Sequence, residues 1–249
     1  MARITETVKI LIITNVLVWL CAQFLLPSAI EILGLWFPKN PNFQVWQPLT
    51  HMFMHDQSSI FHILFNMYAL WMFGSPIEAI LGQKRFIFFY FSAGLGAALI
   101  HTLVNYYYFN EGYQALLGAG LGVQEIENVI ATTRVPQYVL ETVEESTLRT
   151  FVETYYTPAV GASGAIYGVL VAFGMMFPNM ELMLIFVPIP IKAKYFIPAL
   201  ILLDLFSGVT GFSVFGQNIA NWAHLGGALF GFIMMWYWKR NSFNDKRWY

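Results

Sequence analysis

Hydrophobic residues fall into six long runs separated by more polar stretches, and this pattern dominates the chain. A helix needs about 20 largely apolar residues to cross the hydrocarbon core of a bilayer. Each run approaches that length, so the pattern predicts an all-α polytopic membrane protein with six spans. The predicted spans are residues 10–26, 60–81, 86–108, 159–177, 195–212 and 219–238.

The composition agrees with a membrane location and excludes several other classes. Hydrophobic residues make up 57% of the 249 residues and charged residues 11%, against about 25% charged in a typical globular chain. The net charge is −1, from 13 basic and 14 acidic residues. No excess of basic residues is available to neutralise phosphates, so we expect no nucleic-acid partner. The single cysteine, Cys21, excludes an intramolecular disulfide and a cysteine-based zinc cluster.

Lysine and arginine residues are distributed unevenly between the loops, which predicts the orientation in the membrane. If both termini are cytoplasmic, all basic residues except Lys39, Arg134 and Arg149 lie on the cytoplasmic side. Basic residues precede the first apolar run, as they do in a signal peptide. However, this run is long and Pro27-Ser28-Ala29 is a poor cleavage site, so a retained helix is favoured.

Three connections between the predicted spans have distinctive sequences. Residues 33–59 contain several aromatic side chains, which favour the membrane interface, so we expect this first loop to be partly embedded. Residues 110–158 are rich in glutamate and should form an extracytoplasmic insertion, with a helix around residues 139–155. Residues 180–194 are apolar but contain two prolines, which prevent a continuous helix and favour a cytoplasmic turn or hairpin.

Polar residues inside the predicted spans indicate function, because they are costly in hydrocarbon. His62 and Asn66 lie four positions apart in the second span, so both side chains project from one helix face. A helix-packing hydrogen bond is the alternative interpretation of this pair.

The fourth and sixth spans carry a serine and a histidine among small residues. Ser163 stands between Gly161 and Gly164, and His224 precedes Gly227. In both spans glycines recur at four-residue spacing, Gly164 with Gly168 and Gly227 with Gly231, which allows two helix backbones to pack closely. If these two faces meet, Ser163 and His224 come together, and Tyr167 lies one turn below Ser163 to support the imidazole. The alternative is close packing without chemistry.

Such a convergence would support acyl transfer. A serine needs an adjacent base to become a nucleophile. The tetrahedral intermediate needs hydrogen-bond donors aimed at its oxyanion, and His62, Asn66 and the Ser163 amide are candidates.

Taken together, these motifs resemble those of rhomboid intramembrane serine proteases of the bacterial six-helix type. The resemblance covers nearly the whole chain. It rests on His62-x-x-x-Asn66-Met67, Phe73-Gly74 and Glu78 in the second span, Gly161-Ala162-Ser163-Gly164 with Tyr167 in the fourth, and Ala223-His224-x-x-Gly227-x-x-x-Gly231 in the sixth.

The resemblance implies a role for each of these residues. Ser163 would be the nucleophile, His224 its base and Tyr167 a ring stacked on that base, while His62 and Asn66 would bind the oxyanion. Gly161, Gly164 and Gly227 would support the dyad.

The resemblance also implies an architecture and a substrate. The chain would be one rhomboid-like membrane domain (residues 1–249) with the first loop embedded, residues 215–220 capping the site and the fifth span acting as a lateral gate. Its partners would be single-pass transmembrane substrates and membrane lipids, and it would need no metal and no cofactor. The bare six-helix layout favours a bacterial cytoplasmic membrane.

The chain departs from the family pattern at two places. Gln47 follows Trp46 in the first loop, where the family usually has arginine, which puts the stability of the loop in doubt more than catalysis. The 110–158 insertion is longer than the corresponding loop of compact members, and it could restrict or recruit substrates.

Several alternatives stay open. Asp204 in the fifth span could complete a Ser-His-Asp triad, although an aspartate at this place in the family is not catalytic. His51 and His55 have the spacing of a metal pair, but hydrogen-bonded roles are favoured, and Glu78 should brace the end of the second span or its neighbouring loop. A pseudoprotease that binds clients without cleavage is the main rival function. A transporter is disfavoured because we find no repeat or charged pathway.

Overall fold

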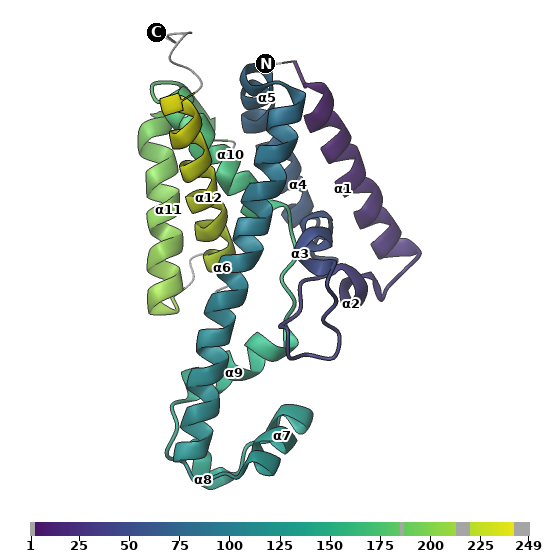
Figure 1. Ribbon diagram of the computed structural model, residues 1–249, viewed down its shortest axis with the longest axis vertical. Helices are drawn as coiled ribbons and strands as arrows, with labels where there is room; N and C mark the ends of the chain where they lie inside the picture. The colour runs from purple at the N-terminus through teal and green to yellow at the C-terminus, as the bar shows by residue number, and fades with distance from the viewer. Residues whose placement is uncertain (1–2, 185–186, 213–219, 242–249) are drawn as a thin grey trace.

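The computed structural model describes residues 3–184, 187–212 and 220–241, and helices account for most of them (Figure 1). The elements in chain order are α1 (Glu6–Phe24), α2 (Ala29–Leu33), α3 (Gln47–Thr50), η1 (His51–Phe53), α4 (Ile60–Ala69), η2 (Leu70–Gly74), α5 (Ser75–Leu81), α6 (Gln83–Gly118), α7 (Val123–Thr132), α8 (Gln137–Leu140), α9 (Glu145–Tyr156), α10 (Ser163–Met176), β1 (Glu181–Leu184), β2 (Val187–Lys192), α11 (Ala193–Thr210) and α12 (Ala220–Asn241).

Four helical segments of the described residues are long and apolar enough to cross a membrane. They are Glu6–Phe24, Ile60–Leu81, Gln83–Gly118 and Ala193–Thr210, and each overlaps a predicted span. The prediction of an all-α polytopic membrane protein is confirmed. α10 is a shorter apolar helix of 14 residues, and α12 is not among the four, so the number of six spans stays a prediction.

Helix α6 is the central element and was predicted too short. It continues to Gly118 instead of ending at residue 108, so residues 110–118 belong to it and not to a separate insertion. The apolar run is interrupted at Asn110 and Glu111, but both are exposed, whereas Phe109, Gly112 and Leu116 continue the buried face. At 1.5 Å per residue, the 36 residues make a rod about 54 Å long.

Helices α7, α8 and α9 lie beside the C-terminal part of α6, at one end of the molecule (Figure 1). A predicted helix over residues 139–155 is instead two helices, because residues 141–144 turn between α8 and α9. These helices enclose a second hydrophobic core, here called the aromatic cluster, formed by Phe37, Phe109, Leu116, Leu121, Ile126, Val129, Val139, Leu148 and Phe151.

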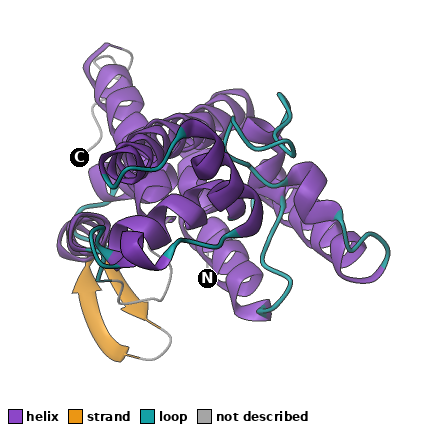
Figure 2. Ribbon diagram, turned by 90° about the horizontal axis from the view of Figure 1, so that it is seen from below, coloured by secondary structure: helices purple, strands orange, loops and turns teal. Residues whose placement is uncertain are grey.

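The predicted hairpin between the fourth and fifth spans is confirmed, and Glu78 has an unexpected partner. Residues 180–194 contain an antiparallel hairpin of β1 and β2, which stands to one side of the helices in Figure 2. The predicted role of Glu78 at the end of the second span or its neighbouring loop is wrong. The carboxylate of Glu78 instead accepts hydrogen bonds from the backbone N–H groups of Thr7 and Val8, both 2.9 Å long, and so caps the start of α1.

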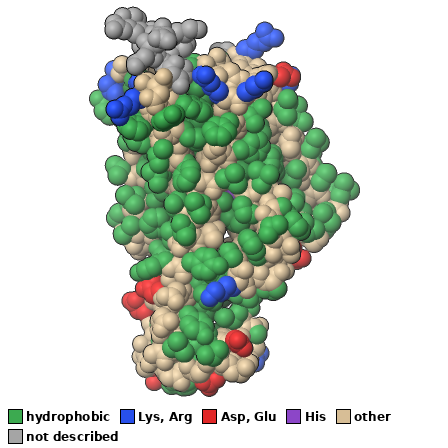
Figure 3. Space-filling view, in the orientation of Figure 1, with side chains coloured by type: hydrophobic (Ala, Val, Ile, Leu, Met, Phe, Trp, Pro, Cys, Tyr) green, Lys and Arg blue, Asp and Glu red, His purple; other side chains and the backbone are tan. Residues whose placement is uncertain are grey.

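Exposed side chains are sorted along the long axis. Figure 3 shows lysine and arginine gathered at one end, hydrophobic side chains over the middle and most acidic side chains at the end formed by α7–α9. Exposed hydrophobic side chains of the long helices, among them Ile10, Leu17, Phe88 and Leu202, would be unfavourable in water and suit a lipid environment.

Candidate active site

Ser163 and His224 meet where α10 and α12 pack together. Ser163 is the first residue of α10, and its Oγ lies 2.8 Å from Nε2 of His224 in α12. This is within hydrogen-bond distance for a hydroxyl and an imidazole. The predicted convergence of these two residues, 61 positions apart in sequence, is therefore confirmed.

Glycines produce this approach, as predicted. A Cβ atom at Gly227 would overlap the carbonyl group of Gly164, and one at Gly231 would lie 2.5 Å from Cα of Gly168. On the other side of α10, Cβ atoms at Gly164 and Gly168 would collide with the methyl groups of Ala97 and Ala93 in α6. We call these contacts the glycine seam; its members are Gly164, Gly168, Gly227, Gly231, Ala93 and Ala97.

Two side chains flank the His224 ring. Tyr167 stacks on it with the ring centroids 4.2 Å apart and the planes 7° apart, so the predicted stacking is confirmed. On another side, Oδ2 of the buried Asp204 lies 3.3 Å from Nδ1 of His224. The orientation of the carboxylate relative to the ring does not make this contact a hydrogen bond. Among the described residues, neither Asp204 Oδ2 nor His224 Nδ1 has a hydrogen-bond partner.

His62 faces Ser163 from α4 across Gly161. Gly161 has φ +122°, a conformation that side chains other than glycine rarely adopt. A Cβ atom built there would lie 2.9 Å from His62 Nε2 and 3.6 Å from Ser163 Oγ. Glycine is therefore required both by the backbone conformation and by the space between these two side chains.

Asn66 lies one turn after His62 and is buried, as expected for the same helix face. Its amide nitrogen donates to the backbone carbonyl of His62 at 2.8 Å within α4 itself, so this bond is not the helix-packing hydrogen bond of the alternative interpretation. A carboxamide has a second N–H, so this bond leaves one donor over.

The backbone around Ser163 is held from two sides. The backbone N–H groups of Leu35, in the first loop, and Ala159 each donate to the other residue's carbonyl. The N–H of Gly161 donates to the carbonyl of His51 at 3.0 Å. The first N–H groups of a helix lack partners within it and carry partial positive charge, so the start of α10 presents such donors beside the Ser163 hydroxyl.

The two histidines of the first loop, His51 and His55, are buried, which indicates a structural role. His51 Nδ1 lies 3.0 Å from the Gln47 carbonyl, and His55 has no exposed surface. Burial lowers the pKa of His51 to about 4 and that of His55 to about 3, so both are neutral near pH 7. Within the described residues no group of three potential ligands is placed to hold a metal ion.

Sequence analysis missed one neighbour of the site. The backbone N–H of Asp56 donates to Nδ1 of His62 at 3.2 Å. The sequence Asp56-Gln57-Ser58 does contain the signal of a turn, since aspartate and serine commonly form one. The predicted cap, residues 215–220, falls almost entirely outside the described residues.

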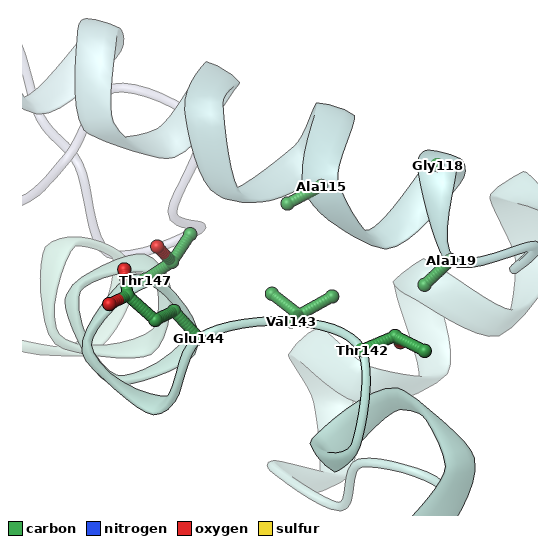
Figure 4. Close-up of a pocket in the computed structure, with 7 residues that line it drawn as sticks. All are labelled: Ala115, Gly118, Ala119, Thr142, Val143, Glu144 and Thr147. Carbon is green, nitrogen blue, oxygen red and sulfur yellow. The ribbon is translucent and has the colours of Figure 1, made fainter.

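A cavity of about 270 Å³ lies away from these residues, between the end of α6 and the segment before α9 (Figure 4). Ala115, Val143, Glu144 and Thr147 are among its lining residues. None of the candidate catalytic residues lines it.

Comparison with known proteins identifies the family of the chain. The Rhomboid domain model matches residues 42–128 and 122–241. The human protein "Presenilin-associated rhomboid-like protein, mitochondrial" is 31% identical over 93% of this chain and 47% of its own length. "Rhomboid protein 1, mitochondrial" of Saccharomyces cerevisiae is 25% identical over 86% of the chain and 51% of its own length. "Rhomboid protease GlpG" of Salmonella choleraesuis is 35% identical over 31% of the chain and 28% of its own length. The chain thus spans about half the length of the two mitochondrial relatives.

Proposed function

The chain belongs to the rhomboid family, and from this premise we propose that it is an intramembrane serine protease that cleaves single-pass membrane proteins. The observation that carries the proposal is the 2.8 Å contact between Ser163 Oγ and His224 Nε2, with Tyr167 stacked on the imidazole. A serine hydroxyl bonded to a neutral imidazole is the arrangement that nucleophilic catalysis requires.

In the proposed reaction, Ser163 Oγ attacks the carbonyl carbon of the scissile peptide bond while its proton passes to His224 Nε2. The Ser163 N–H, His62 and the second N–H of Asn66 stabilise the oxyanion that forms. The C–N bond then breaks, and His224 gives its proton to the leaving amine. Water attacks the acyl-serine while one of its protons passes to His224. The ester C–O bond then breaks, His224 returns the proton to Ser163 Oγ, and the second product leaves with a free carboxylate.

Substrate entry requires a lipid-facing approach to the dyad. A substrate helix hides its carbonyl groups in internal hydrogen bonds, because unpaired amides in hydrocarbon cost several kcal/mol. The substrate must therefore unwind beside polar groups, and Ser163, His62 and His224 are the partly exposed polar groups at this junction. Membrane lipids and single-pass substrates are the proposed partners.

The proposed mechanism is a dyad, with Asp204 outside the proton path. Its carboxylate is near His224 but does not form a directed hydrogen bond. In triad enzymes, replacing the aspartate by asparagine lowers kcat by about 10⁴. We expect Asp204→Asn to lower kcat by less than about tenfold, since no directed bond is lost. A loss of the triad size in a folded variant would instead establish the triad.

The decisive test combines labelling with cleavage. A fluorophosphonate should modify Ser163 in the wild-type protein, and Ser163→Ala should abolish both labelling and release of fragments from a transmembrane substrate. A pseudoprotease would show no labelling and no fragments in either form. Full cleavage by Ser163→Ala would reject Ser163 as the nucleophile.

Integral membrane location is supported by the four long apolar helices. The bacterial cytoplasmic membrane remains the prediction from sequence, and the mitochondrial names of two relatives weigh against it. Cytoplasmic termini, a single domain and an extracytoplasmic α7–α9 segment are likewise proposals.

A further inference from the structure

The hydrogen bond on one ring nitrogen of His62 determines what its other nitrogen can do. The backbone N–H of Asp56 points at Nδ1 from 3.2 Å. A backbone N–H can only donate, so Nδ1 must present its lone pair. A neutral imidazole carries one hydrogen, which must then be on Nε2.

The other nitrogen, Nε2, borders the place where a substrate carbonyl would react. It lies beside Gly161, and a Cβ atom built on that glycine would be within 2.9 Å of Nε2 and 3.6 Å of Ser163 Oγ. An N–H at this position is a donor facing the nucleophile, whereas a lone pair there would repel an oxyanion. The tautomer of His62 therefore decides whether this residue assists or opposes the reaction.

Asp56 is itself fixed by contacts that lead to α1. Its carbonyl accepts a hydrogen bond from Trp19 Nε1 at 3.2 Å, and its carboxylate accepts the N–H of Ser58 at 2.8 Å. The next residue, Gln57, donates through Nε2 to the carbonyl of Ala22 at 2.8 Å. The turn of residues 56–58 thus has a hydrogen bond of its own and is attached to the C-terminal half of α1.

We propose that Asp56 is a positioning residue, whose backbone N–H holds His62 as the Nε2–H tautomer facing Ser163 and which α1 keeps in place through Trp19. This inference deepens the proposed function and rests on it. It also explains why α1, which contributes no catalytic side chain, would affect the chemistry.

The test is ¹⁵N NMR of histidine-labelled protein, with the His62 signals assigned by their loss in His62→Gln. The wild type should show His62 with its hydrogen on Nε2. Asp56→Pro removes the N–H, so Nδ1–H should become populated and kcat should fall about ten- to hundredfold, approaching the loss of one oxyanion donor, with KM changed much less. Asp56→Asn is the matched control, because it keeps the N–H and the side-chain acceptor; it should keep the Nε2–H tautomer and cleave at least about tenfold faster than Asp56→Pro.

A second variant covers the case in which Asp56→Pro fails to fold. Trp19→Phe loses the indole donor to the Asp56 carbonyl and should give a smaller shift toward Nδ1–H, with a kcat reduction of about three- to tenfold. An unchanged Nε2–H tautomer and wild-type kcat in Asp56→Pro would overturn the inference, as would equal losses in Asp56→Pro and Asp56→Asn. The NMR readout does not depend on turnover, so an inactive wild type would reject the proposed function while the tautomer assignment is judged separately.

Discussion

The glycine seam and the aromatic cluster join the same helix, α6, to its neighbours by opposite means. In the seam, α6 presents the methyl groups of Ala93 and Ala97 to glycines of α10, and the backbone of α10 lies directly against that of α12. In the aromatic cluster, α6 presents Phe109, which stacks on Phe151 of α9 with centroids 4.8 Å apart. Backbones in contact cannot adjust, whereas large side chains can change rotamer and repack.

This difference explains where the candidate chemistry lies. The positions of Ser163 and His224 depend on the distance between α10 and α12. The glycines set that distance, because the two backbones leave no room for a methyl group between them. The aromatic cluster shares no residue with the seam, so we expect changes in it to leave the dyad in place.

The largest effect should come from one methyl group in the seam. Gly227→Ala places a Cβ atom on the Gly164 carbonyl and must push α12 away from α10. A displacement of about 1 Å can cost about 10²-fold in rate, so we expect cleavage to fall at least that far, together with lower thermal stability. Fluorophosphonate labelling of Ser163 would report the loss of activity, and a thermal melt would report the loss of stability.

The control for this substitution is Gly118→Ala at the end of α6, where an added Cβ meets nothing within 4 Å. It should leave activity unchanged. Wild-type labelling by Gly227→Ala would show that the seam tolerates separation and that the comparison is wrong.

The aromatic cluster should give a large but local effect. Phe151 is fully buried and packs on Gly112 and Phe109, so Phe151→Ala should destabilise the α7–α9 segment by about 3–5 kcal/mol. Hydrogen exchange in residues 121–156 should rise, while labelling of Ser163 should change less than about threefold because the seam is untouched. A loss of labelling as large as that of Gly227→Ala would mean that the two regions act as one.

The first loop contributes Phe37 to the aromatic cluster, and its internal hydrogen bonds depend on Gln47. The side-chain amide of Gln47 is fully buried. It accepts a hydrogen bond from the backbone N–H of Trp36 at 3.3 Å and donates one to the backbone carbonyl of Asn42 at 2.8 Å. It thereby organises the loop without the family arginine. Gln47→Ala leaves these groups unpaired and should cost about 1–3 kcal/mol in the free energy of unfolding. Gln44→Ala, an exposed glutamine of the same loop, is the control and should cost almost nothing; equal losses would show that Gln47 has no special role.

Acid sensitivity should be the smallest effect near neutral pH. His51 and His55 stay neutral in the folded state because burial lowers their pKa values to about 4 and about 3. The unfolded chain takes up these protons below about pH 6.5, so stability should fall as pH decreases from about 6.5 toward 4. Each histidine adds a slope of up to about 1.4 kcal/mol per pH unit.

His55→Phe should remove the share of this slope that belongs to His55, and chemical unfolding in detergent at several pH values would measure it. An acid slope as steep as that of the wild type would exclude His55 as its source.

The sequence by itself determined the helical membrane class, the approximate spans and the residues of the candidate dyad. Apolar run length and four-residue glycine spacing are local properties, and local properties can be predicted from a chain without its fold. The extension of α6 to Gly118 was missed for the same reason, since only packing against α9 shows that Phe109, Gly112 and Leu116 continue one buried face.

Only the tertiary structure decided how the candidate groups are oriented. That Asp204 lies near His224 without a directed bond, that Asn66 bonds its own helix, and that the Asp56 N–H selects a His62 nitrogen are relations between atoms. Two of these three contacts join separate elements, and all three depend on hydrogen-bond direction, which residue types and spacing do not encode.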